Sequence, residues 1–123
     1  MHCVQGSNGV AFHPELRLPE GTLVLSKGVD PDMDGYSAFE GVSEDGRRLS
    51  SVLKDLGAEH LYLAGLATDY CILFTAREAL RSGLTVTILT DAVAGVDLTP
   101  GDSDLALQEL QSAGAQLSTV GEL

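Results

Sequence analysis

The chain has 123 residues, of which 44% are hydrophobic and 20% are charged, the composition of one globular domain and not of a disordered chain. Seven basic residues against 18 acidic ones give a net charge of −11, so we expect neither nucleic acid nor an anionic membrane surface as a partner. Two cysteines are too few for a disulfide scaffold, no apolar run approaches the ~18 residues of a membrane span, and the sequence start lacks the pattern of a signal peptide. These features favour a cytoplasmic protein.

The first predicted strand is the apolar run Thr22–Ser26. The next segment then carries four apolar residues at the spacing of one helical face: Leu49, Val52, Leu53 and Leu56. Gly57 follows as the stop signal of that helix. Two stretches read as loop, namely residues 1–21 and Gly28–Gly46. The second is long for a compact domain, and long loops are often functional.

The rest of the chain continues the alternation. Further strands are predicted over His60–Leu66, Leu84–Thr90 and Gln116–Val120. Two helices separate these strands: one from an N-cap at Asp69 through Arg81, and one from Thr99-Pro100 to Ala113. For Asp69 and Asp91 a hydrogen bond to a loop is the alternative role. Strands that alternate with helices predict an α/β fold with a parallel sheet whose strands are buried on both faces. Sites in such folds lie at the C-terminal ends of the strands, where Lys27, Ala67–Cys71 and Asp91 fall.

Cys71 is the first candidate for chemistry. It lies where a predicted strand gives way to a helix, and a helix N-terminus favours the reactive thiolate. Its alternative interpretation is a small hydrophobic residue of the core. Lys27 follows the strand Thr22–Ser26 and could assist a thiol or hold a tetrahedral intermediate. Its alternative is a solvated lysine at a strand end.

Three other patterns are weaker. The acidic segment "DPDMDG" (30–35) resembles the start of a calcium loop, but Gly41 occupies the twelfth position, so a solvated acidic turn is the better interpretation. The residues His2, Cys3 and His13 fit no zinc spacing. His60 opens a strand and is expected to be structural.

Four separated motifs carry a resemblance to a known family. They are "HCVQGSNGVAFHP" (2–14), "LSKGVDPDMDGYSAFEG" (25–41), "GLATDYCILFTAREALRSG" (65–83) and "DAVAGV" (91–96). In order and spacing they resemble the nicotinamidase (pyrazinamidase-like) branch of the isochorismatase-like cysteine hydrolase superfamily. The resemblance implies the three-layer, Rossmann-like parallel-sheet fold of that superfamily. It covers residues 1–123 as a single partial domain, the C-terminal portion, with the N-terminal strands missing.

The family chemistry implies a role for each matching residue. Cys71 would be the nucleophile that attacks a carboxamide carbon, releases ammonia and forms a thioester that water hydrolyses. Lys27 would be the second catalytic residue. The backbone N–H groups of Ala67 and Cys71 would form an oxyanion hole, with a cis peptide bond between Leu66 and Ala67. Tyr36 and Leu66 would line the substrate pocket.

The resemblance also implies a metal. In nicotinamidases the histidine of the "HCV" motif is a ligand of a divalent zinc, iron or manganese ion, and this role falls on His2. The family's catalytic aspartate and its Asp-x-His ligand pair lie upstream of that motif, where this chain has only Met1. We therefore expect the chain alone to be inactive and not to hold the metal by itself, because loss of a general base costs about 10²–10⁴-fold in rate.

The leading hypothesis is an amidohydrolase that converts nicotinamide, or a related pyridine carboxamide, to nicotinate and ammonia in NAD salvage. A second is another isochorismatase-like cysteine hydrolase. A third is a non-catalytic remnant, or a subunit completed by a partner. A homo-oligomer stays open, since an unpaired apolar strand edge promotes association.

Overall fold

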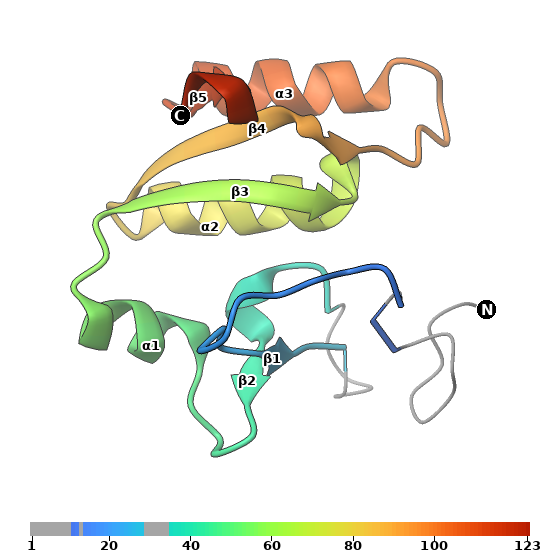
Figure 1. The fold of residues 1–123 in the computed structure, drawn as a ribbon. Helices are drawn as coiled ribbons and strands as arrows, with labels where there is room; N and C mark the ends of the chain where they lie inside the picture. Colours follow the sequence, from blue (N-terminus) through green and yellow to red (C-terminus); the bar gives the residue numbers. More distant parts are fainter. Residues whose placement is uncertain (1–10, 13, 29–34) are drawn as a thin grey trace.

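The computed structural model describes residues 11, 12, 14–28 and 35–123. Its elements form two groups (Figure 1). The sheet group contains a three-stranded sheet with two long helices. The N-terminal group contains the short strands β1 and β2 and the helix α1, and it lies beside the sheet group. The described residues contain no helix that is both long and apolar enough to cross a membrane.

The sheet of the sheet group is parallel. Its strands β3 (His60–Leu66), β4 (Thr85–Ala94) and β5 (Gln116–Ser118) lie in the order β3-β4-β5. The pairing of β3 with β4 shifts register between Leu63 and Gly65. Strand β3 has the predicted bounds and β5 lies within its predicted range, whereas β4 continues to Ala94, past the predicted end at Thr90. The α/β fold with a parallel sheet is confirmed.

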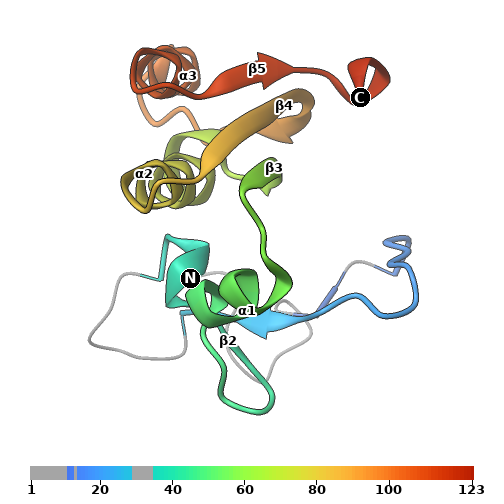
Figure 2. The ribbon, with the colours of Figure 1, turned by 90° about the vertical axis from the view of Figure 1, so that its left-hand side faces the viewer.

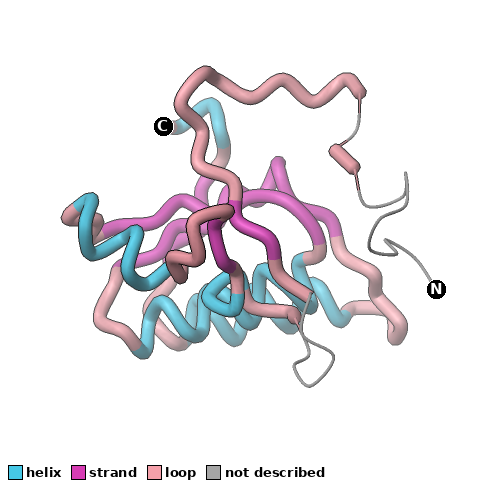
Figure 3. The backbone as a smooth tube through the Cα atoms, turned by 90° about the horizontal axis from the view of Figure 1, so that it is seen from below, coloured by secondary structure: helices cyan, strands magenta, loops and turns pink. Residues whose placement is uncertain are grey.

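The helices of this group follow the strands in the expected alternation. A π-helical turn (Thr68–Ile72) leads into α2 (Leu73–Arg81), and α3 (Asp102–Ser112) follows β4. Both α2 and α3 cover the same face of the sheet (Figure 2). The view from below shows the long helices along one side of the strands (Figure 3).

The core lies between β4 and these helices. The residues that expose no surface there are Ala76, Ala79, Val86, Ile88 and Leu110. The two alanines lie on α2, and their small side chains allow the helix to pack closely against the sheet. Strand β4 is buried on both faces, because Thr87 and Leu89 are also less than 9% exposed. The prediction of a strand buried on both faces is therefore confirmed for β4.

For β3 that prediction is wrong. Leu61 and Leu63 pack against the core, but Tyr62 between them is 58% exposed. Strand β3 is an edge of the sheet, since β4 is its one partner among the described residues. His60 is structural as expected: its ring hydrogen-bonds the hydroxyl groups of Thr85 and Thr87 on β4.

The first predicted strand also differs from expectation. Only Leu25–Ser26 form β1, which pairs antiparallel with β2 (Val42–Ser43) and does not join the parallel sheet. The preceding residues Leu23 and Val24 are 52% and 45% exposed. Among the described residues no parallel strand lies beside Thr22–Ser26, so only its last two residues find a strand to pair with.

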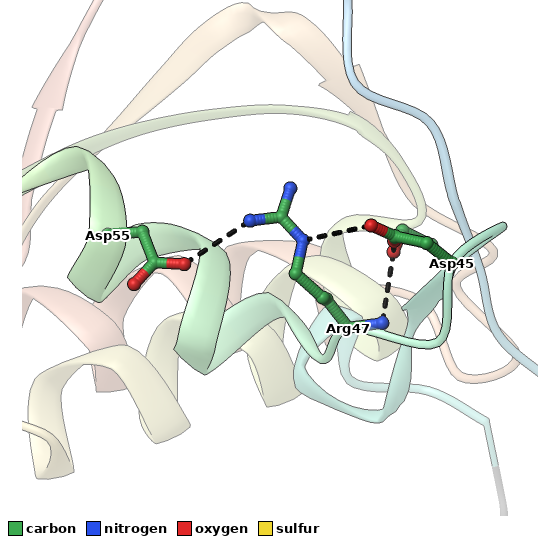
Figure 4. Close-up of polar contacts among 4 residues, drawn as sticks. Asp45, Arg47 and Asp55 are labelled. Carbon is green, nitrogen blue, oxygen red and sulfur yellow. Dashed lines mark hydrogen bonds and ion pairs between the residues drawn. The ribbon is translucent and has the colours of Figure 1, made fainter.

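Helix α1 (Leu49–Leu56) begins and ends where the periodicity predicts, and Gly57 takes the left-handed conformation with a φ of 67°. Val52 is 3% exposed, whereas Leu56 at the end of the predicted apolar face is 68% exposed. Before the helix, the guanidinium of Arg47 lies between Asp45 and Asp55, at 3.4 and 3.2 Å from their carboxylates (Figure 4). These exposed ion pairs join the turn that follows β2 to helix α1.

A short 3₁₀ turn, η2 (Ala38–Glu40), links the two groups. The Ser37 hydroxyl caps it by accepting a hydrogen bond from the Phe39 backbone N–H. The Ala38 N–H donates to the hydroxyl of Thr75 on α2 at 2.8 Å, and Phe39 is 8% exposed in the core. The residues just after the long loop are thereby attached to α2. A second 3₁₀ turn, η4 (Val120–Glu122), follows β5.

Candidate active site

Cys71 and Lys27 meet although 44 residues separate them in sequence. The Nζ of Lys27 lies 3.2 Å from the Sγ of Cys71. The same ammonium donates a hydrogen bond to the carbonyl oxygen of Gly35 at 2.5 Å. Lys27 follows β1 in the N-terminal group, whereas Cys71 precedes α2 in the sheet group. The two candidate catalytic side chains thus come from different groups and form one polar contact.

The turn that carries Cys71 is wound more widely than an α-helix. The carbonyl of Ala67 accepts hydrogen bonds from the backbone N–H groups of Tyr70 at 3.1 Å and Ile72 at 3.0 Å, and the latter is the i→i+5 bond of a π-helix. Thr68 and Ile72 are the buried residues of this turn, whereas Cys71 is only partly buried. Cys71 is therefore not a residue of the fully buried core, which was its alternative interpretation.

The peptide bond between Leu66 and Ala67 is cis, as the resemblance implies. It connects the end of β3 to the turn of Cys71. The proposed oxyanion donors, the N–H groups of Ala67 and Cys71, therefore belong to one short segment.

Two glycines shape the environment of Lys27. Gly28 and Gly35 both take positive φ, at 73° and 72°. A Cβ on Gly35 would lie 2.7 Å from the Cα of Gly28, which is closer than real Cβ contacts allow. Glycine at position 35 therefore lets the chain close on itself and presents the Gly35 carbonyl to the ammonium. Sequence reasoning missed this role of Gly35.

Asp69 does not cap the helix, so the predicted N-cap is wrong. Its two carboxylate oxygens accept hydrogen bonds from consecutive backbone N–H groups of the loop after β4, from Val96 at 3.0 Å and Asp97 at 2.8 Å. Desolvation raises the pKa of Asp69, but the backbone hydrogen bonds from Val96 and Asp97 outweigh it and hold the pKa below its ordinary value. Asp91 has a comparable role, because it accepts a hydrogen bond from the Val120 N–H at 3.0 Å.

Three aromatic rings form a cluster that includes Tyr70, the residue before Cys71. Tyr36 stacks on Phe74 with 5.3 Å between ring centroids and is 5.4 Å from the ring of Tyr70. A hollow of about 370 Å³ is bordered by Tyr36 and Phe74. Its remaining lining residues are Ser37, Phe39, Glu40, Arg48 and Glu78.

The hollow is not centred on the Cys71–Lys27 contact. Neither of these residues is among its lining, and neither is Leu66, whose side chain is 73% exposed. Of the two predicted pocket residues, Tyr36 borders this hollow and Leu66 does not. The predicted catalytic residues Cys71 and Lys27 meet outside its lining.

The predicted metal ligand His2 lies outside the described residues, as do Cys3, His13 and residues 30–34 of the acidic turn. Within residues 11–12, 14–28 and 35–123 no three His, Cys, Asp or Glu side chains come together closely enough to hold a metal ion. The role of His2 as a metal ligand therefore stays a prediction.

The chain is similar to known proteins in sequence and in structure. The sequence matches the family described as "Isochorismatase domain" over residues 1–122. It is 42% identical over 125 residues to a nicotinamidase of Escherichia coli strain K12, an alignment that covers 98% of this chain and 57% of that protein.

Two solved structures are also similar. One is a pyrazinamidase of Pyrococcus horikoshii in complex with zinc, with a TM-score of 0.82 and 38% identity, covering 97% of this chain and 62% of that one. The other is PnC1 from L. infantum in complex with nicotinate, with a TM-score of 0.84 and 36% identity, covering 98% and 60%. The chain thus spans about three fifths of the length of these relatives.

Proposed function

The chain belongs to the isochorismatase family, and we propose that the protein carrying it is an amidohydrolase that converts nicotinamide, or a related pyridine carboxamide, to nicotinate and ammonia. The observation that carries this proposal is the contact of Lys27 Nζ with Cys71 Sγ at 3.2 Å. At this distance the Lys27 ammonium can stabilise negative charge that develops on the Cys71 sulfur during the reaction. The relatives named as nicotinamidase and the nicotinate bound to PnC1 support the choice of substrate. Such an activity would serve NAD salvage.

In the proposed reaction the Cys71 sulfur attacks the carboxamide carbon, and the carbonyl oxygen takes up negative charge. The N–H groups of Ala67 and Cys71 would hold this oxygen, since both belong to the short turn that follows β3. The carbonyl then re-forms as the C–N bond breaks, and the nitrogen leaves as ammonia with the proton that the Cys71 thiol gave up. Water hydrolyses the resulting thioester, which releases the carboxylic acid and restores the thiol.

Lys27 has the second role in this proposal. Its ammonium lies against the sulfur and against the Gly35 carbonyl, so it can stabilise the tetrahedral intermediate that forms on attack. Tyr36 would form one wall of the substrate pocket, because its ring is fixed against Tyr70 and Phe74. Leu66 would cover the substrate from the end of β3.

The metal does not enter these steps. The zinc of the pyrazinamidase from Pyrococcus horikoshii supports a divalent ion in relatives of this chain, and His2 stays the predicted ligand here. The general base is likewise assigned by the resemblance to an aspartate upstream of the "HCVQG" motif. We therefore propose that residues 1–123 act as one partial domain, and that this chain expressed by itself is inactive.

The test is ammonia release from nicotinamide by the protein expressed from the complete reading frame of its gene. Cys71→Ala is expected to abolish the activity, by about 10⁴-fold or more, because the nucleophile is lost. Cys3→Ala removes the other cysteine and is expected to leave the rate within about threefold. Turnover that survives in Cys71→Ala would reject the proposal.

A second candidate is a subunit that a partner completes, and the exposed edge of β3 favours it. Tyr62 and Leu66 are 58% and 73% exposed along a strand that pairs on one side only among the described residues. Sedimentation of the 12.9 kDa chain distinguishes the two. A well-folded monomer would contradict this second candidate.

A further inference from the structure

Asp69 and the loop after β4 form a connection that the proposed chemistry does not use. The Asp69 carboxylate lies two residues before Cys71, on the turn that also begins at the Ala67 carbonyl. It accepts one hydrogen bond on each oxygen, from Val96 and Asp97. Two bonds from consecutive backbone groups fix both the position and the plane of a carboxylate, whereas one bond would let it rotate.

The loop that receives Asp69 is itself held in place. Asp97 has a φ of 52°, which is unusual for a residue other than glycine. Its carboxylate accepts hydrogen bonds from the backbone N–H of Ser103 at 2.8 Å and from the Ser103 hydroxyl at 3.0 Å. Ser103 belongs to the first turn of α3. A Cβ at Gly95 would collide with the Ser103 hydroxyl at 1.6 Å, so a larger residue there would push the loop away from α3.

The result is a continuous set of contacts from α3 to the turn of Cys71. It passes from Ser103 to Asp97, and from the backbone of Val96 and Asp97 to Asp69. A π-helical turn is the less regular form of helix and occurs mostly as a single turn at functional sites. The orientation of Cys71 then depends on what holds this turn from outside.

We infer that Asp69 is a positioning residue, which holds the turn of Ala67 and Cys71 against the loop after β4 and so keeps the Cys71 sulfur beside Lys27. The inference rests on the proposed role of Cys71 as nucleophile. Asp69 takes no part in bond formation. It acts through the backbone, so its loss changes the geometry of the reactive groups and removes none of them.

The first test needs no substrate. Alkylation of Cys71 by iodoacetamide is measured by mass spectrometry in the 123-residue chain, with Cys3 of the same molecule as the internal reference. Asp69→Ala is expected to lower the ratio of Cys71 to Cys3 modification by about threefold to tenfold, because the sulfur is no longer held beside the Lys27 ammonium. Asp69→Asn keeps one acceptor oxygen, so its ratio is expected to lie between those of the unaltered chain and Asp69→Ala.

Asp104→Ala is the matched control. Asp104 is an exposed residue in the first turn of α3, so its replacement removes the same charge without touching the loop. The ratio is expected to stay within about 1.5-fold of the unaltered chain. A ratio in Asp69→Ala that is unchanged or higher would overturn the inference.

A second test uses the protein expressed from the complete reading frame. Because a displacement of about 1 Å at a reacting atom can cost 10²-fold in rate, Asp69→Ala is expected to lower kcat by about this factor and to change KM by less than about threefold. A change in KM alone would overturn the inference. Absence of nicotinamide hydrolysis in the unaltered protein would reject the proposed function, while the alkylation ratio still decides the role of Asp69.

Discussion

The sheet group and the N-terminal group differ in how they bury their apolar residues. In the sheet group Val86, Ile88 and Leu110 expose no surface. In the N-terminal group Leu23 and Val24 are about half exposed, at 52% and 45%. The candidate site draws one catalytic side chain from each group. Cys71 therefore lies beside a buried core, whereas Lys27 is held by its contacts with Gly35 and Cys71.

The largest effect is expected from truncating the core of the sheet group. Leu110→Ala removes a fully buried side chain between α3 and the sheet and is expected to lower the free energy of unfolding by about 2–5 kcal/mol. Leu23→Ala in the N-terminal group is expected to change it by less than about 0.5 kcal/mol. Urea unfolding followed by circular dichroism gives both values. Equal losses in the two variants would contradict the difference between the groups.

The contacts that hold Lys27 can be tested through Gly35. Gly35→Ala places a Cβ 2.7 Å from the Gly28 Cα, which displaces the carbonyl that accepts the Lys27 hydrogen bond. We expect kcat for nicotinamide hydrolysis to fall by about tenfold or more. Gly46→Ala is the control, because Gly46 also has a positive φ, of 84°, but has open space around its Cβ position. It is expected to keep the rate within about twofold, and a comparable loss in both variants would rule out this explanation.

The smallest effect concerns the acid range, where the two groups again differ. Desolvation opposes the backbone hydrogen bonds of Asp69, which prevail, so its pKa is lower in the folded chain than in the unfolded one. Such a carboxyl contributes stability above its unfolded pKa of about 3.9 and loses that contribution as the pH falls through its folded pKa. The stability difference between the unaltered chain and Asp69→Asn should therefore be largest near neutral pH and shrink below pH ~4.

Asp45 in the N-terminal group provides the comparison. The Ser43 hydroxyl, followed by Arg47, lowers the pKa of Asp45, so the sign is the same. Its side chain is 67% exposed, and solvent screens its interactions. Asp45→Asn should consequently show a smaller pH-dependent difference than Asp69→Asn in urea midpoints measured between pH 3 and 7. A larger difference for Asp45 would contradict the assignment of the stronger contacts to the sheet group.

Much of the fold could be predicted from local signals. The periodicity of α1 and the glycine after it are properties of neighbouring residues, and the structure has this helix over Leu49–Leu56. The run Thr22–Ser26 has the composition of a strand, but a strand also needs a partner. Here the partner is Val42–Ser43, which is antiparallel and two residues long. Composition contains no information about which segment will pair.

The site was less accessible to sequence reasoning. Residue types and spacing alone left Cys71 open between a nucleophile and a core residue, and only the family resemblance joined it to Lys27. The hydrogen bonds of Asp69 to the loop after β4 span 27 and 28 residues, so the local pattern left an N-cap and a loop-bonding role open and could not name the partner. The local signal for a turn at this loop is the "GVD" segment that ends in Asp97, because aspartate tolerates the left-handed conformation found there.

The central claim is that Lys27 and Cys71 act as one reactive centre across the two groups. The most direct measurement is the rate of iodoacetamide alkylation at Cys71 in the 123-residue chain carrying Lys27→Met, relative to Cys3. Our account predicts a fall of about tenfold, because the ammonium 3.2 Å from the sulfur is lost. Lys54→Met, which removes a lysine from the last turn of α1, should leave the rate unchanged. An equal rate at Cys71 in the two variants would contradict the account.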